Sequence, residues 1–366
     1  MLLSVCMIVK NEELLLEKTL ESIKLIADEI IITDTGSTDK TVEIAKRFTD
    51  KIYYFNWNDN FSDAYNFTKN KAIFPYVCRW DADFLLRKGS LDSLLALKNR
   101  NFDNADIVYF TWNIAFGDNN DPINSIHRWF IFKKGKFNFE SEIHADITPT
   151  NPDLSIVAKS YPSIEIDHLK DKQQKAFRYL QTLNIVKNIL KKDPYNKRIL
   201  FAYAEELLFK KDFSKAIEMF LKFLQIETTD TEKIVVTLEN LLLCYLSLGQ
   251  KNELKVLLDK YYKYYLNYPR FLLAYADMMA LFDIKIAEKL YLQYLLKPVN
   301  PITSIYLFDY ERHIIHPHFA LAQIYFQLNK HLQSYNHLSF VIKNTRLNKK
   351  RLSAMILIEK INHLSK

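Results

Sequence analysis

The sequence contains little glycine. Its 366 residues include five glycines, and no two of them lie within ten residues of each other. Walker-type phosphate loops and the G-x-G-x-x-G dinucleotide turn both need closely spaced glycines, because the backbone must approach the phosphates. Both kinds of loop are therefore excluded, and any bound phosphate must be held by other groups.

Cysteine is also scarce. Cys6, Cys78 and Cys244 each lie in an apolar run, and none of them forms a C-x-x-C pair. This pattern favours a reducing compartment and argues against a disulfide framework or a cysteine zinc site. We expect all three cysteines to be packing residues.

Long apolar runs are missing as well. The chain has no stretch of 18 apolar residues, the length that suggests a membrane helix. The apolar start at residues 2–9 lacks a preceding basic segment and is followed at once by a polar segment, residues 10–13. We therefore interpret it as a buried strand and not as a signal peptide. The expected location is cytoplasmic.

The hydrophobic pattern divides the chain near residue 170. Hydrophobic residues make up 49% of the chain, enough for two ordinary domains, which excludes a disordered or fibrous protein. Residues 1–170 alternate short apolar runs with amphipathic stretches, which predicts an α/β domain. The expected strands are residues 2–9, 29–33, 52–55, 76–80, 107–112 and 127–132, and the expected helices are residues 13–25, 41–48, 62–72 and 90–98.

Residues 171–366 have the pattern of an all-α domain with no convincing strand. A first helix is expected at residues 173–190, followed by helix pairs at 196–227, 234–265 and 316–342. The spacing of these pairs is close to that of tetratricopeptide (TPR) repeats, although the consensus tryptophan is missing. We therefore predict a TPR-like helical-repeat domain, with a plain helical bundle as the alternative.

Charge divides along the same boundary. Residues 1–170 carry a net charge of −5 and residues 171–366 one of +12. An acidic α/β domain and a basic helical domain suggest that the second domain meets something anionic. A solvated lysine face is the alternative. Nucleic acid is not an expected partner, because the basic residues are dispersed and no binding motif accompanies them.

The segment YVCRWDAD at residues 76–83 has the strongest chemical signal. A predicted strand runs into Asp81 and Asp83, and in an extended chain this spacing places both carboxylates on one side. Two such carboxylates can bind a hard divalent cation. A diphosphate leaving group that is not held by a glycine loop needs such a metal or several cations. Turn caps are the alternative role for these aspartates.

A second segment, IIITDTGSTD at residues 30–39, is a strand followed by a turn at Gly36 and a helix N-terminus. The turn accounts for the residues after Asp34 but not for Asp34 itself. This aspartate lies at the carboxyl end of a predicted parallel strand, where ligands bind in open α/β sheets.

Further candidates lie between residues 140 and 168. His144 or His168 can complete a metal site begun by the aspartates. Asp146 can remove the proton of an attacking thiol or hydroxyl, and Glu140 and Glu142 compete for that role. The alternatives are a hydrogen-bonded structural histidine and exposed loop carboxylates.

Four ordered segments resemble the family 2 glycosyltransferases. They are SVCMIVKNEE at 4–13, ADEIIITDTGSTDKTVEIAK at 27–46, WNDNFSDAYN at 57–66 and WDAD at 80–83. The resemblance implies a GT-A fold, which binds a nucleotide sugar, and a single displacement that inverts the anomeric centre. It covers about the first 170 residues.

The resemblance also implies roles for individual residues. The backbone around Val9 and Asn11 and the Asp34 carboxylate would line the uridine pocket, Asp81 would lie near the ribose and metal, and Asp83 would ligate Mg²⁺ or Mn²⁺.

Two positions depart from the family pattern. Relatives usually carry arginine, a partner for donor phosphate, where this chain has Tyr65, so Arg79 or Arg128 would substitute. Relatives also tend to have His-Glu where this chain has His144 followed by Ala145.

Within the family, the segment at residues 61–66, the Ile-His pair at 143–144 and the TPR-like domain look most like the sublancin-type peptide S-glycosyltransferases. These enzymes attach a hexose from a UDP-sugar to a cysteine of a bacteriocin precursor. The resemblance therefore implies a metal-dependent transferase that moves a hexose, with glucose expected, from a UDP-sugar to a cysteine, serine or threonine of a small peptide. The resemblance is also compatible with a homodimer.

Two alternative functions remain open. One is a glycosyltransferase that acts on lipopolysaccharide core or another cell-surface glycan. The other is a TPR-type peptide-binding protein with a decayed transferase domain, which Tyr65 and Ala145 suggest.

Overall fold

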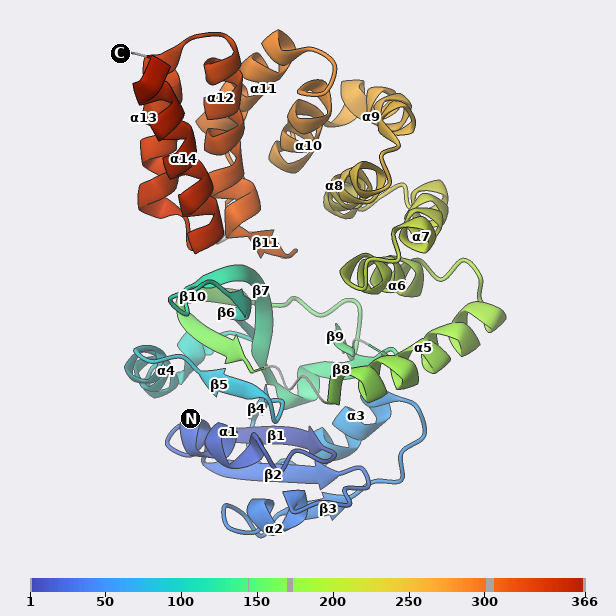
Figure 1. Ribbon diagram of the computed structural model, residues 1–366. Helices are drawn as coiled ribbons and strands as arrows, with labels where there is room; N and C mark the ends of the chain where they lie inside the picture. Colours follow the sequence, from blue (N-terminus) through green and yellow to red (C-terminus); the bar gives the residue numbers. More distant parts are fainter. Residues whose placement is uncertain (1, 144, 170–173, 301–305, 365–366) are drawn as a thin grey trace. The chain divides into compact units, whose positions relative to one another are not determined.

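The computed structural model describes residues 2–143, 145–169, 174–300 and 306–364, with the backbone alone for residues 174–181 (Figure 1). The chain forms two compact units. The α/β unit contains Met1–Ala115, Ser125–Ile185 and Pro301–Leu307, and the helical unit contains Phe116–Asn124, Val186–Asn300 and Phe308–Lys366. The boundary between the two compact units lies at Ile185, within the first long helix. The predicted domain boundary at residue 170 stays a prediction.

The α/β unit is built on a mixed sheet in the order β3-β2-β1-β4-β7-β6-β10-β5. Strand β1 is parallel to β2 and β4, and β2 is parallel to β3, whereas β7 is antiparallel to β4. Strand β10 is parallel to β6 and antiparallel to β5. The strands are β1 Leu3–Val9, β2 Glu29–Asp34, β3 Ile52–Tyr54, β4 Tyr76–Arg79, β5 Phe84–Leu86, β6 Ile107–Phe116, β7 Pro122–Lys133 and β10 Ala158–His168, and a separate ribbon pairs β8 Phe137–Glu140 with β9 Asp146–Pro149.

Strand β1 explains how the core of this unit is built. Its residues Leu3–Val9 are almost all buried, as in a parallel strand that is covered on both faces. Side chains alternate between the two faces, so Leu3, Val5 and Met7 pack in one hydrophobic cluster with α1 and α4, and Cys6 packs in another with α3. The helices are α1 Leu16–Ile23, α2 Thr41–Ala45, α3 Phe61–Lys71 and α4 Ser90–Asn99.

All six expected strands of this unit are present, but the sequence analysis missed β5, β8, β9 and β10. Strand β10 contains Pro162, and its register shifts between Tyr161 and Glu165, so its hydrophobic alternation is interrupted. The prediction for the three cysteines is confirmed, because Cys6, Cys78 and Cys244 are all buried and free.

The helical unit consists mainly of antiparallel helix pairs (Figure 1). The predicted pairs are α6–α7, α8–α9 and α12–α13, while the sequence analysis missed the pair α10–α11, the helix α14 and the short strand β11 Phe308–Asp309. The helices are α5 Gln174–Lys192, α6 Lys197–Phe209, α7 Phe213–Ile226, α8 Thr231–Ser247, α9 Lys251–Tyr265, α10 Pro269–Met279, α11 Ile284–Leu296, α12 His316–Gln327, α13 His331–Asn344 and α14 Asn348–Leu364.

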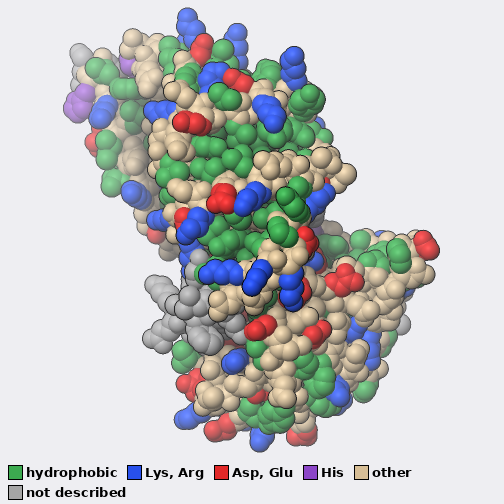
Figure 2. Space-filling view, turned by 90° about the vertical axis from the view of Figure 1, so that its right-hand side faces the viewer, with side chains coloured by type: hydrophobic (Ala, Val, Ile, Leu, Met, Phe, Trp, Pro, Cys, Tyr) green, Lys and Arg blue, Asp and Glu red, His purple; other side chains and the backbone are tan. Residues whose placement is uncertain are grey.

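Local sequence signals set the starts of several of these helices. The side chains of Asp212, Asp230 and Asp283 accept hydrogen bonds from backbone N–H groups of the first turns of α7, α8 and α11. Ala204 and Ala216 are fully buried, which lets α6 and α7 approach closely. Lysine and arginine side chains are spread among hydrophobic and neutral ones on the face in Figure 2. Within the described residues, no helix combines the length and apolar character of a bilayer span.

Asp106 connects three strands of the α/β unit. It precedes β6, and its carboxylate lies 2.8 Å from the ammonium groups of Lys133 and Lys136 and 3.0 Å from the Val157 amide, which precedes β10. Burial alone would raise the pKa of this carboxyl, but the three donors lower it to about 2. The ion pairs therefore stabilise the strands that carry Arg128 and His168.

We expect Asp106→Asn to lower the free energy of unfolding at pH 7 by about 2 kcal/mol, as a pKa depressed from 3.8 to about 2 implies. The stabilisation is fully present above pH 4 and is lost as the pH falls toward 2, because the unfolded state binds the proton first. Urea unfolding followed by tryptophan fluorescence measures the difference, since all four tryptophans lie before residue 170. Asp153→Asn, at an exposed position, is the control. A deficit as large at pH 3 as at pH 7 would contradict the prediction.

Candidate active site

The candidate residues gather where neighbouring parallel strands end. Val9 at the end of β1 is in register with Asp34 at the end of β2, and Cys6 is in register with Arg79 at the end of β4. The carboxyl ends of β1, β2 and β4 therefore lie at one edge of the sheet, where open α/β sheets bind their ligands.

Asn11 and Asp34 join the first two loops at this edge. The Asn11 side chain accepts a hydrogen bond from the Thr38 amide at 2.8 Å, and the Asn11 amide donates to the Ser37 hydroxyl. The Asp34 carboxylate accepts hydrogen bonds from the amides of Gly36 and Ser37, at 3.0 and 3.1 Å. The turn therefore does account for Asp34, contrary to the expectation from the sequence. A role for Asp34 in uridine binding stays a prediction.

The two aspartates of the WDAD segment have different partners. The expectation of an extended chain is wrong here, because the Phe84 amide donates to the Asp81 carbonyl at 3.0 Å and closes a turn. Asp81 contacts Arg79 and Tyr65, whereas Asp83 contacts His168. A metal site that uses both carboxylates stays a prediction.

Asp81 is held from two sides. Arg79 donates to both of its oxygens, at 2.7 and 3.2 Å, and the Tyr65 hydroxyl donates to one of them at 2.7 Å. Burial would raise the pKa of Asp81, but Arg79 and Tyr65 lower it below its usual value. The guanidinium lies 4.4 Å from the centre of the Tyr65 ring. Asp81 therefore neutralises the charge of Arg79.

Asp83 and His168 form a second pair. His168 Nε2, at the end of β10, lies 3.0 Å from Asp83 Oδ2, and the Leu169 amide donates to the Asp83 carbonyl at 2.7 Å. His168 Nδ1 is buried and has no hydrogen-bond partner in the part of the chain that the structure describes. His144, the competing ligand, lies outside the described residues. In the described part of the chain, no cluster of three or more histidine, cysteine, aspartate or glutamate side chains could hold a metal ion.

Arg128 of β7 lies among aromatic rings, and the charges of Asp146 and Asp81 attract it from beyond ion-pair distance. Its guanidinium lies 5.4 Å from the Trp112 ring and 5.7 Å from the Trp129 ring, and it donates to the Ala145 carbonyl at 3.4 Å. None of the described carboxylates lies within ion-pair distance of it. Burial and the neighbouring Arg79 lower the pKa of Arg128 to about 10. It therefore stays charged at neutral pH and favours an anion.

The proposed proton acceptors lie at different depths. Asp146 begins β9, and one of its oxygens accepts hydrogen bonds from the Trp129 indole and from the Ile147 amide at 3.0 Å. Glu142 has an exposed side chain, and its carbonyl accepts from the Phe61 amide at 3.0 Å. Glu140 is exposed and pairs with Asp146 in the β8–β9 ribbon. Asp146 is the one of the three that contacts the tryptophan beside Arg128.

Trp112 and Trp129 lie beside these candidate residues. The sequence favours core packing for most aromatics and leaves stacking on a sugar open for this pair. Trp112 lies 5.1 Å from the His168 ring and 5.4 Å from the Arg128 guanidinium. Trp112 therefore connects the Asp83–His168 pair with the unpaired arginine. The only signal in the sequence is the Arg-Trp pair at residues 128–129, which by itself does not distinguish a site from a core.

Comparisons with known proteins agree with this architecture. Residues 4–152 match the model of glycosyl transferase family 2. The SPbeta prophage-derived glycosyltransferase SunS of Bacillus subtilis is 28% identical over 273 residues, which cover 69% of this chain and 60% of that protein. A TPR repeat-containing protein of Synechococcus elongatus is 41% identical over 80 residues, 22% of this chain and 20% of that protein.

Among solved structures, TarS of S. aureus aligns with a TM-score of 0.36 and 16% identity, over 67% of this chain and 49% of that one. The chain thus spans a fifth of the Synechococcus relative and three fifths of SunS. Residues 4–152 are therefore similar to glycosyl transferase family 2, and a TPR-like helical domain follows them.

Proposed function

We propose that the protein is a metal-dependent, inverting hexosyltransferase that moves a hexose, with glucose expected, from a UDP-sugar to a cysteine, serine or threonine of a peptide. One observation carries the proposal: the Trp112 ring lies 5.1 Å from the His168 ring of the Asp83–His168 pair and 5.4 Å from the guanidinium of Arg128, which forms no ion pair with a described carboxylate. A departing UDP develops negative charge, and a cation fixed in a site of low polarity stabilises that charge strongly. The resemblance to peptide S-glycosyltransferases supports the peptide acceptor.

Asp83 and His168 would hold a divalent metal ion through the Asp83 carboxylate and His168 Nε2, which lie 3.0 Å apart. The carboxylate oxygen is the ligand of this pair that suits Mn²⁺ or Mg²⁺. When bound, the metal supplies positive charge for the diphosphate. The pair falls short of a full coordination shell, which leaves positions for donor oxygens and water.

The remaining residues of the site would act on the donor and the acceptor. Arg128 would bind the diphosphate, while Val9, Asn11 and Asp34 would line the nucleoside pocket. Asp146 would accept the proton of the nucleophile, because its second oxygen makes no hydrogen bond among the described residues. Glu142 is the alternative base.

The chemistry of the acceptor affects how strong the base must be. A cysteine thiol has an unperturbed pKa of about 8.5 and is partly ionised at neutral pH, whereas a serine hydroxyl is not. A sulfur nucleophile therefore needs only weak assistance from a carboxylate such as Asp146.

We expect Asp83→Asn to reduce Mn²⁺-dependent hydrolysis of UDP-glucose roughly 100-fold, because the variant loses the charge that binds the metal. Steady-state release of UDP measures the effect. Asp92→Asn, at an exposed position of α4, should retain the activity of the unmodified protein. Full activity in Asp83→Asn would show that the metal mechanism is wrong.

Arg128→Met should weaken UDP binding by roughly 10- to 100-fold, the range of a charge-assisted hydrogen bond to an anion. Binding of uridine, which has no phosphate, should change much less. Calorimetry with both ligands tests the difference, and Arg47→Met, which changes an exposed arginine, is the control. An equal loss for uridine and UDP would assign Arg128 a structural role. Absence of any metal-dependent UDP binding by the unmodified protein would favour the decayed-transferase alternative.

The acceptor class is tested by incubating the protein with radiolabelled UDP-glucose and, in parallel, with cysteine-containing peptides and glycolipid extracts. We expect the label to enter the peptides, because a thiol needs little help from the base. Prior alkylation of the cysteines should abolish transfer if sulfur is the nucleophile and leave it unchanged if serine or threonine is. Label that enters only the lipid fraction would support the cell-surface glycan alternative.

A further inference from the structure

Two histidines of the helical unit face each other across the α12–α13 helix pair. His318 lies near the start of α12 and His337 in the middle of α13, and together they form the histidine pair. Their Nδ1 atoms are 2.9 Å apart, and their ring centres are 5.0 Å apart. Both rings are partly exposed, so a small ion can reach them from the solvent.

Aromatic side chains of the same two helices fix the orientation of the pair. The His318 ring is stacked on Phe340 of α13, with ring centres 3.8 Å apart and planes inclined at 18°. The His337 ring is stacked in the same way on Tyr325 of α12, with centres 5.6 Å apart. Each ring is thus held by an aromatic ring of the opposite helix. The two Nδ1 atoms are therefore preorganised by the packing of the helices.

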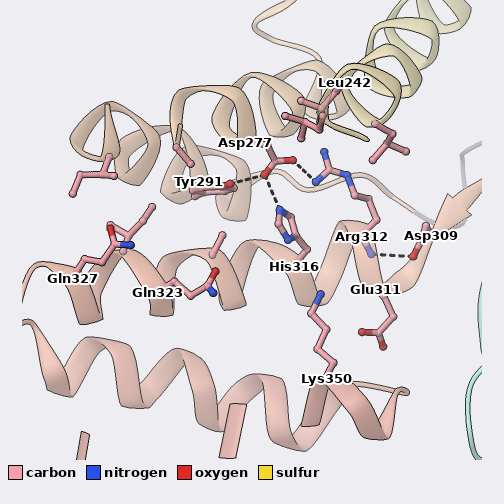
Figure 3. Close-up of a pocket in the computed structure, with 16 residues that line it drawn as sticks. Leu242, Asp277, Tyr291, Asp309, Glu311, Arg312, His316, Gln323, Gln327 and Lys350 are labelled. Carbon is pink, nitrogen blue, oxygen red and sulfur yellow. Dashed lines mark hydrogen bonds and ion pairs between the residues drawn. The ribbon is translucent and has the colours of Figure 1, made fainter. Parts of the chain in front are cut away.

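The histidine pair differs from other histidines of the helical unit in its surroundings. Figure 3 shows Asp277 beside His316, and His316 Nε2 lies 2.6 Å from the carboxylate. His313 Nδ1 lies 3.7 Å from a carboxylate oxygen of Glu239. Among the described residues, by contrast, no carboxylate lies within ion-pair distance of either ring of the histidine pair. No acidic neighbour therefore favours its protonated form.

Both rings of the histidine pair are neutral at pH 7. Burial and the neighbouring His337 lower the pKa of His318 to about 4, and burial lowers the pKa of His337 as well. One Nδ1 atom then carries the proton of the hydrogen bond, and the other offers its lone pair. Neutral imidazole is the form of histidine that binds metal ions.

The separation of the Nδ1 atoms also matches two ligands of a single metal ion. Imidazole nitrogens lie about 2.0–2.1 Å from a bound zinc ion, and similar distances at a right angle place two nitrogens about 2.9 Å apart. A tetrahedral angle would need about 3.3 Å. The observed 2.9 Å therefore fits a square-planar or tetragonal ion, the geometry of Cu²⁺ and Ni²⁺, better than tetrahedral Zn²⁺.

We propose that His318 and His337 bind one Cu²⁺ or Ni²⁺ ion through their Nδ1 atoms. The ring that carries its proton on Nδ1 would transfer it through water to its own Nε2, so that both Nδ1 lone pairs are free and no net proton is released. Two bonds from nitrogen to the metal form, and two water molecules leave the hydrated ion. Other waters complete the coordination shell.

The chemistry of the ligands sets the preference of this site. Imidazole suits Cu²⁺ and Ni²⁺, whereas Mg²⁺ and Mn²⁺ prefer oxygen ligands, which the histidine pair does not offer. A metal that bridges α12 and α13 binds the folded chain more tightly than the unfolded chain and so stabilises it. The inference concerns the helical unit alone and does not rest on the transferase proposal.

The test titrates the full chain with Ni²⁺ by calorimetry, in excess Mg²⁺ and without any nucleotide sugar. Loss of one ring should weaken binding of the ion roughly 100-fold, because the second ring binds an ion that the first already holds. His318→Asn and His337→Asn should each show this loss. His363→Asn, at an exposed position of α14, is the control and should retain the ion. Asp83→Asn should retain it too, which separates this site from the metal of the proposed transferase.

Two further measurements report on the ligands and on the fold. Electron paramagnetic resonance of the Cu²⁺ complex should show coupling to two imidazole nitrogens. Ni²⁺ at about 100 times its dissociation constant should raise the unfolding temperature of the helices, followed by circular dichroism, by about 5 °C. If His318→Asn does not fold, His318→Phe keeps the stack on Phe340 and should still lose the ion.

Several results would overturn the proposal. They are unchanged binding of Ni²⁺ in both His318→Asn and His337→Asn, loss of the ion in Asp83→Asn or His363→Asn, tighter binding of Mn²⁺ than of Ni²⁺, and the absence of any Ni²⁺ binding by the unmodified protein. A Cu²⁺ spectrum without imidazole coupling would also contradict it.

Discussion

The ion pair between Arg79 and Asp81 is the interaction on which the arrangement of the candidate active site depends. Two arginines, Arg79 and Arg128, lie near the same backbone carbonyl of Ala145. Two buried guanidinium groups so close together repel each other, and this repulsion contributes to the lowered pKa of Arg128. Asp81 offsets one of the two charges. Asp146 and Asp81 attract the charge of Arg128, but neither forms an ion pair with it.

In the proposed function, this arrangement takes the place of a glycine-rich phosphate loop. The chain has no closely spaced glycines, so side chains would supply the positive charge for a diphosphate. Tyr65 contributes indirectly, because its ring lies against Arg79 and its hydroxyl contacts Asp81. The tyrosine that departs from the family pattern is thus part of the ionic network. Its presence gives no reason to regard the domain as decayed.

Much of the fold could be predicted because its signals are local. The buried runs of β1, β2 and β4 and the apolar spacing of α3, α4 and α6–α9 show directly in the sequence. The pair α10–α11 and strand β10 could not be found in this way. Strand β10 has a proline and a register shift where alternation is expected, and it is held in place by its neighbours β6 and β5.

The candidate site could be predicted only in part, for the same reason. The edge of the sheet that carries the candidate site could be predicted from the ends of the parallel strands. The sequence analysis had also named Asp83, His168 and Arg128 as candidates. Which of these residues meet depends on tertiary contacts. A single turn hydrogen bond between Asp81 and Phe84 separates the two aspartates, and His168 reaches Asp83 from a strand that the sequence did not reveal. Spacing along the chain carries no information about either contact.

The net charge of a domain does not show which of its charged groups have partners. Residues 1–170 are acidic overall, yet Arg128 in this part of the chain forms no ion pair with a described carboxylate, while Arg270 and Arg312 of the basic helical unit both do. A ligand responds to the groups within a few ångströms, because more distant charges on the surface are screened by salt. A cation such as Arg128 is therefore a better basis for a binding proposal than the total charge of the domain that carries it.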